Sequence, residues 1–136
     1  MADRPRVLLI GDSIRLGYQQ LVATRLGAAV EVSGPPGYCG DSGDVLKRLG
    51  DWIAPGTTLV AVNAGLHDLV RLARVGRNRV EIDRYEAISP ASSGSSAPWG
   101  SPLGGPASIA ADGVHLTADG YAVVADAVAA KVAELL

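Results

Sequence analysis

Cysteine and histidine are scarce in this chain of 136 residues, and their scarcity restricts the chemistry that it can perform. The single cysteine, Cys39, excludes an internal disulfide and a cysteine-rich metal site. His67 and His115 are the only two histidines, so the choice of an imidazole base is very small. A metal site built from them and nearby aspartates is disfavoured, because their spacing matches no zinc motif.

The chain also lacks a strong net charge and a long apolar run. Its formal charge of −2 provides no electrostatic basis for binding nucleic acid. The N-terminal apolar run, at residues 7–10, is too short for a secretion signal or a membrane span, so we expect a cytoplasmic protein without a membrane partner. Because 48% of its residues are hydrophobic, we expect a single globular domain over residues 1–136.

Apolar periodicity predicts alternating strands and helices, which is typical of a parallel α/β sheet. Strands are predicted over residues 7–10, 29–32 and 58–62, and helices over residues 14–26, 44–53 and 67–74. We expect Gly27 to end the first helix. Thr117 is a good N-cap for a C-terminal helix. The apolar stripe of that helix comprises Tyr121, Val124, Val128, Val132 and Leu135.

Residues 89–108 differ in composition from the rest of the chain. Apart from Trp99 and Leu103, this segment contains only glycine, alanine, serine and proline. Such a composition buries too little apolar surface to offset the entropy lost on ordering. We therefore expect a flexible segment without regular structure.

Two short segments supply a serine, a histidine and an aspartate. Ser13, in Gly11-Asp12-Ser13, lies between the first strand and the first helix, and Asp112 lies three residues before His115. A serine hydroxyl needs a base within hydrogen-bond reach, and the base needs an acid that orients its ring. The pattern indicates a triad of Ser13, His115 and Asp112 at the carboxyl edge of the sheet. The alternatives are that Asp12 or Ser13 only caps the helix, and that Asp112 and Gly113 form a turn while His115 is a surface residue.

A second Gly-Asp-Ser occurs at Gly40 to Ser42. With Gly43 it is similar to the nucleophile region of trypsin-like proteases, but their histidine precedes the serine and here both histidines follow it. Ser42 is therefore interpreted as a loop or capping residue. The chain has no Gly-x-Ser-x-Gly elbow, which disfavours an α/β-hydrolase, and no Gly-x-Gly-x-x-Gly or Walker lysine, which disfavours a nucleotide-binding domain.

The segment after the third predicted strand contains two candidate donors to an oxyanion. Asn63 and His67 both lie in the run Asn63-Ala64-Gly65-Leu66-His67-Asp68. An amide or ring N–H at the carboxyl edge of the sheet is suited to stabilising negative charge. The alternative is that Asp68 caps a helix while His67 packs nearby.

Together these segments resemble the SGNH, or GDSL-type, hydrolase family of esterases and lipases. Residues 7–18 resemble the first block of the family, and Gly40 matches the glycine of its second block. Residues 65–68 are similar to the third block, Gly-x-Asn-Asp, and residues 112–115 match the last, Asp-x-x-His. The resemblance covers about residues 6–86 and 109–136, and it implies a flavodoxin-like α/β fold.

The resemblance implies a role for each matched residue. Ser13 is then the nucleophile, His115 the base and Asp112 the acid that orients it. The backbone N–H groups of Ser13 and Gly40 belong to the oxyanion hole, with His67 or Asn63 as a third donor. The substrate is then a small acyl ester, and no cofactor or metal is required.

The chain departs from the family in two places. His67 stands where the third block has asparagine, although a ring N–H donates the same kind of hydrogen bond. The chain is also shortened between the third and last blocks, so we expect a small parallel sheet of about three to four strands flanked by helices. The alternative function is therefore a shortened relative that is non-catalytic or depends on a partner to cover its open sheet edge.

Overall fold

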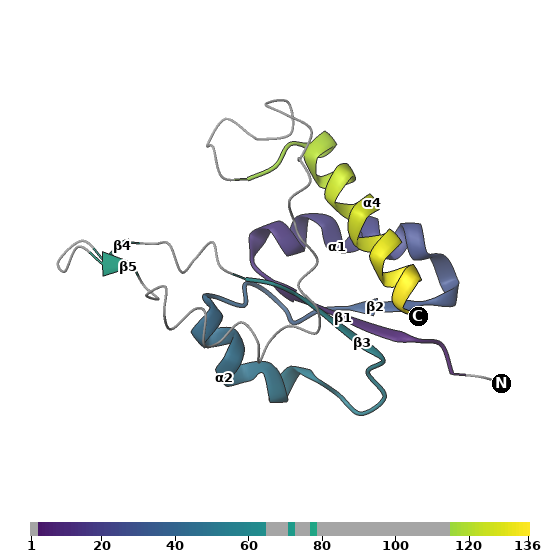
Figure 1. Ribbon diagram of the computed structural model, residues 1–136, viewed down its shortest axis with the longest axis horizontal. Coiled ribbons are helices and arrows are strands. Elements are labelled where there is room, and N and C mark those ends of the chain that lie inside the picture. The colour runs from purple at the N-terminus through teal and green to yellow at the C-terminus, as the bar shows by residue number, and fades with distance from the viewer. Residues whose placement is uncertain (1–2, 65–70, 73–76, 79–114) are drawn as a thin grey trace.

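The computed structural model describes residues 3–64, 71–72, 77–78 and 115–136 of the chain. They form an α/β structure in which a parallel sheet lies between helices (Figure 1). The strands of this sheet are β1 (Arg6–Gly11), β2 (Glu31–Ser33) and β3 (Leu59–Asn63). The helices are α1 (Ser13–Leu26), α2 (Ser42–Trp52) and α4 (Ala118–Leu135), and a short 3₁₀ helix, η1 (Gly27–Ala29), follows α1. The α/β class and the small parallel sheet agree with the expectation from the sequence.

Strand β1 is the central strand of the parallel sheet. The sheet has the order β2-β1-β3, with both neighbours parallel to β1. Its apolar run, Val7-Leu8-Leu9-Ile10, is buried on both faces, as a central parallel strand requires. Because side chains alternate along a strand, β1 contributes to two separate cores.

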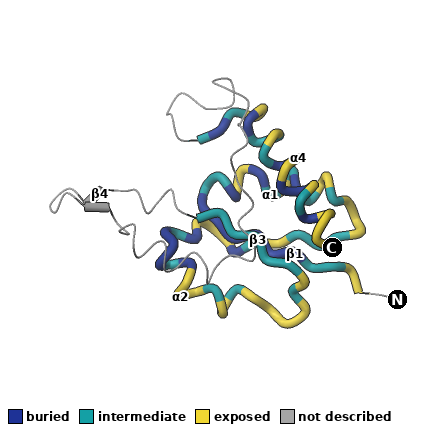
Figure 2. The backbone as a smooth tube through the Cα atoms, in the orientation of Figure 1, coloured by how far each residue is buried: buried dark blue, intermediate teal, exposed yellow. Residues whose placement is uncertain are grey.

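One core lies between the sheet and the helices α1 and α4. It contains Val7, Leu9, Tyr18, Val22, Ala125, Val128, Ala129 and Val132. The other lies on the face covered by α2 and contains Leu8, Ile10, Cys39 and Val45. Figure 2 shows buried and exposed segments alternating along α1 and α4, as expected of helices that bury one face.

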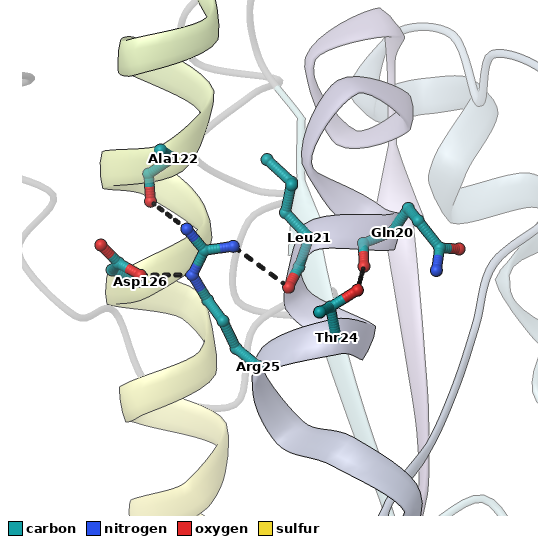
Figure 3. A network of polar contacts seen from close by, with 6 residues as sticks. All are labelled: Gln20, Leu21, Thr24, Arg25, Ala122 and Asp126. Carbon is teal, nitrogen blue, oxygen red and sulfur yellow. Dashed lines mark hydrogen bonds and ion pairs between the residues drawn. The ribbon is translucent and has the colours of Figure 1, made fainter.

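Helices α1 and α4 approach each other closely at Gly17. A Cβ at this position would collide with the ring of Tyr121. Further along the same interface, Arg25 of α1 forms an ion pair with Asp126 of α4 and donates a 3.4 Å hydrogen bond to the Ala122 carbonyl (Figure 3). The Asp126 side chain is 69% exposed, so the pair contributes at most about 1 kcal/mol.

The expected caps of the first and last helices are confirmed. Gly27 is the C-cap of α1 with a φ of 68°, a conformation that glycine adopts readily. The Thr117 hydroxyl accepts a 3.2 Å hydrogen bond from the Gly120 N–H at the start of α4. Within the predicted stripe of α4, Val128 and Val132 are buried, but Leu135, in the last turn of the helix, is 53% exposed.

Several predicted boundaries are wrong by a few residues. Helix α2 begins at Ser42 rather than at residue 44, because Asp41 and Asp44 form a reciprocal capping box. Strand β2 spans Glu31–Ser33 rather than residues 29–32, because the chain first completes the 3₁₀ turn of η1.

The helix predicted over residues 67–74 is wrong at the two of these residues that the structure describes. Arg71–Leu72 form strand β4, which pairs antiparallel with β5 (Arg77–Asn78). In this pairing the backbone N–H and C=O groups form hydrogen bonds with the other strand, whereas in a helix they would bond to residues four positions away. The remainder of that segment, and the segment 89–108 for which flexibility is predicted, lie outside the described residues.

Two glycine substitutions test the close approach of α1 and α4. Gly17→Ala should lower the free energy of unfolding by about 1–3 kcal/mol, because the new methyl group overpacks against Tyr121. The control is Gly50→Ala in α2, where nothing lies within 4 Å of the new Cβ. It should raise stability by about 0.5–1 kcal/mol through helix propensity alone. Urea denaturation measures both, and equal stabilisation by the two substitutions would contradict the packing described.

Candidate active site

The first Gly-Asp-Ser lies at the junction of β1 and α1. Asp12 is the N-cap of α1, and its side chain accepts a 3.0 Å hydrogen bond from the Ile14 N–H. The capping interpretation is therefore correct for Asp12. Because Asp12 performs this task, the Ser13 hydroxyl is left for another contact at the first position of the helix.

The structure brings Ser13 and His115 together across 102 positions of the sequence. The Ser13 Oγ and His115 Nε2 atoms are 2.8 Å apart, within normal hydrogen-bond range. Both residues are partly buried, so the pair is screened less than at the surface but remains reachable from solvent. This is the contact that activation of a serine by an imidazole base requires.

The pair lies at the N-terminal ends of helices α1 and α4. Ser13 is the first residue of α1, and His115 precedes Thr117, the N-cap of α4. A shift of α4 along α1 would separate the two side chains. The aspartate predicted to orient His115, Asp112, lies outside the described residues.

Gly40 lies in the loop between β2 and α2, and two features require a glycine there. Its φ is 83°, in the left-handed region, and a Cβ would collide with the carboxylate of Asp44. That carboxylate accepts a 3.3 Å hydrogen bond from the Asp41 N–H as part of the capping box. The second Gly-Asp-Ser is thus a helix start, with Asp41 as the cap and Ser42 as the first helical residue.

The loop that ends at Gly40 is bound to the end of β1. The Cys39 N–H donates a 3.1 Å hydrogen bond to the carbonyl of Gly11, directly before the Asp12-Ser13 pair. Gly11 also pairs in register with Asn63 at the end of β3. The residues predicted to form the site therefore gather, where the structure describes them, at the carboxyl edge of the sheet.

The Asn63 side chain has a partner in the core. It hydrogen-bonds to the hydroxyl of Tyr18, a side chain that is only 5% exposed. Burial raises the pKa of Tyr18 from 10.0 to about 12, and the Asn63 hydrogen bond opposes this shift. The other candidate donor, His67, lies outside the described residues.

Arg15 is a polar residue near the site that the sequence analysis did not identify. It is 1% exposed, and its guanidinium contacts the loop that precedes Gly40. A signal was available in the sequence, because Arg15 occupies the same helical stripe as Tyr18 and Val22, which are both buried. A cation on an apolar stripe indicates a buried partner for the charge.

Within the described ranges, no group of three histidine, cysteine, aspartate or glutamate side chains is arranged to hold a metal ion. In the same part of the chain, no helix is long and apolar enough to cross a membrane. Comparison of the chain with protein-family models, with curated proteins and with solved structures finds no match.

The burial of Tyr18 predicts a specific loss of stability at high pH. A pKa raised on folding means that neutral Tyr18 stabilises the fold fully below pH 10.0, and that this contribution is lost as the pH rises through about 12. The difference corresponds to about 3 kcal/mol. Tyr18→Phe should therefore flatten the fall in the free energy of unfolding across this interval. Urea denaturation at a series of pH values measures this free energy. The control is Tyr38→Phe, which should leave the pH profile unchanged because Tyr38 is 66% exposed. Parallel pH profiles for the parent and Tyr18→Phe would refute the assignment.

Proposed function

We propose that this chain is a serine ester hydrolase of the SGNH, or GDSL, type, acting on small acyl esters. The observation that carries the proposal is the 2.8 Å contact between Ser13 Oγ and His115 Nε2. The position of Ser13 supports it further, because the first residue of α1 lies where backbone N–H groups and the helix dipole favour negative charge. The order of the four sequence blocks points to the same family.

In the proposed reaction, Ser13 Oγ attacks the ester carbonyl while His115 Nε2 accepts the hydroxyl proton. The tetrahedral intermediate then collapses, the C–O bond to the alcohol breaks, and His115 returns the proton to the leaving oxygen. Water hydrolyses the resulting acyl-serine with His115 again acting as the base. Because Nε2 is the accepting nitrogen, Nδ1 carries the ring proton, and we assign Asp112 as its acceptor.

The oxyanion needs donors aimed at the position where negative charge develops. The Ser13 N–H is available because the first N–H groups of a helix have no partner within the helix. We assign the Gly40 N–H as a second donor, since no hydrogen bond of this group is seen among the described residues. For the third donor we favour His67 over Asn63, because the Asn63 amide bonds to the buried Tyr18 hydroxyl.

Hydrolysis of p-nitrophenyl acetate tests the proposed nucleophile. Ser13→Ala should reduce kcat by about 10³-fold or more, because no other atom of the site can form the acyl-enzyme. His115→Ala should cost nearly as much, and Asp112→Asn less, because His115 is then present but poorly oriented. The matched control is Ser42→Ala, which alters the serine of the other Gly-Asp-Ser and should retain activity. Turnover that persists in Ser13→Ala would refute the mechanism.

A second pair of variants tests the assignment of the third donor. His67→Ala should lower kcat by about 10²–10³-fold, the usual contribution of one oxyanion donor. Asn63→Ala should mainly lower the melting temperature, because it removes the partner of Tyr18. Steady-state kinetics and thermal melting separate the two effects. The opposite result, with kcat lost in Asn63→Ala alone, would assign the third donor to Asn63.

A further inference from the structure

In the part of the chain that the structure describes, Arg15 is the largest of the fully buried side chains. It lies two residues after Ser13, in the first turn of α1. Burial of a cation is costly unless hydrogen bonds replace its water shell. Among the described residues, its Nε has no hydrogen-bond partner, so the terminal nitrogens must supply most of that compensation.

The terminal nitrogens of Arg15 contact the loop that leads to Gly40. Nη2 donates to the carbonyls of Pro35 and Gly37 at 2.9 and 2.6 Å, and its distance to Cys39 Sγ is 3.7 Å. Nη1 donates to Gln19 Oε1, on the next turn of α1, at 2.7 Å. One planar group therefore connects the helix that begins with Ser13 to three residues of the loop.

The loop depends on these contacts because residues 34–41 form neither helix nor strand. Over residues 34–40, before the capping box of α2, three hydrogen bonds from the loop backbone to the rest of the described structure are seen, and two of them are donated by Arg15. The third is the bond from the Cys39 N–H to the Gly11 carbonyl. At Gly34 the loop lies so close to α1 and β1 that a Cβ would be 2.4 Å from Gln19 Oε1, 2.7 Å from the Leu9 carbonyl and 2.8 Å from Arg15 Nη1.

We infer that Arg15 is a positioning residue of the proposed reaction, which holds the loop so that the Gly40 N–H enters the oxyanion hole. The inference rests on the proposed esterase function. Stabilisation of an oxyanion depends steeply on donor position, and small displacements of a donor are costly in rate. The guanidinium is suited to this task because its rigid fork binds several acceptors at once, which a lysine ammonium does not reproduce.

The test compares Arg15→Lys with Gln19→Ala. Arg15→Lys keeps the charge but loses the fork, and we expect kcat to fall by about 10–10²-fold with little change in KM. Gln19→Ala removes the Nη1 partner on α1 and leaves the loop contacts in place, so its kcat should stay within about threefold of the parent value. Thermal melting of each variant measures the accompanying change in stability.

A thionoester substrate distinguishes positioning of the oxyanion hole from a general loss of structure. Sulfur accepts hydrogen bonds weakly, so replacing the carbonyl oxygen by sulfur reduces the benefit of the hole. We expect the rate ratio of p-nitrophenyl acetate to its thionoester to fall in Arg15→Lys and to be unchanged in Gln19→Ala. Gly34→Ala, whose new Cβ would collide with Gln19, Leu9 and Arg15 and so push the loop away from them, should lower the ratio in the same way. If Arg15→Lys does not fold, Gly34→Ala decides the question.

Each outcome discriminates between the two proposals. A folded Arg15→Lys with parental kcat, or with reduced kcat but an unchanged rate ratio, would overturn the role of Arg15 and leave the esterase proposal intact. If Arg15→Lys does not fold, an unchanged ratio in Gly34→Ala would have the same meaning. A parent chain without turnover that depends on Ser13 would overturn the esterase proposal, and the role of Arg15 with it.

Discussion

The packing of α1 against α4 is the constraint on which the candidate site depends. Ser13 is the first residue of α1 and His115 stands just before α4, so the 2.8 Å distance between their side chains depends on how the two helices fit together. The close approach at Gly17 and the alignment of Arg25 with Asp126 both lie at that interface. Burial of apolar side chains between the helices and the sheet supplies most of the stability, and the exposed Arg25–Asp126 pair adds little to it.

A second constraint operates at the end of β1. Gly11 pairs with Asn63 of β3, and its carbonyl accepts the Cys39 N–H. A Cβ at Gly11 would lie 2.9 Å from the Asn63 carbonyl, so the close approach of these segments needs a glycine. The loop, β3 and the start of α1 therefore meet at one point. Arg15 strengthens this junction, because its buried guanidinium connects α1 to the same loop.

Local patterns in the sequence were sufficient to predict the elements that depend on interactions between near neighbours. The apolar run of β1, the Gly27 C-cap and the Thr117 N-cap all predict structure through interactions between near neighbours. The start of α2 was missed because the Asp41–Asp44 capping box extends the helix beyond its apolar stripe. The helix predicted across residues 71–72 failed because pairing with residues 77–78 takes precedence over helical spacing there.

The sequence by itself determined which chemical groups are present and on which elements they lie. Two histidines left a choice of two bases, and the segment at Ser13 was placed correctly between a strand and a helix. Only the tertiary structure decided that Ser13 meets His115, because a contact across 102 positions depends on packing between distant segments. The same holds for the Tyr18–Asn63 hydrogen bond and for the burial of Arg15 against the loop. These contacts arise from how helices and strands stack, which periodicity along the chain does not encode.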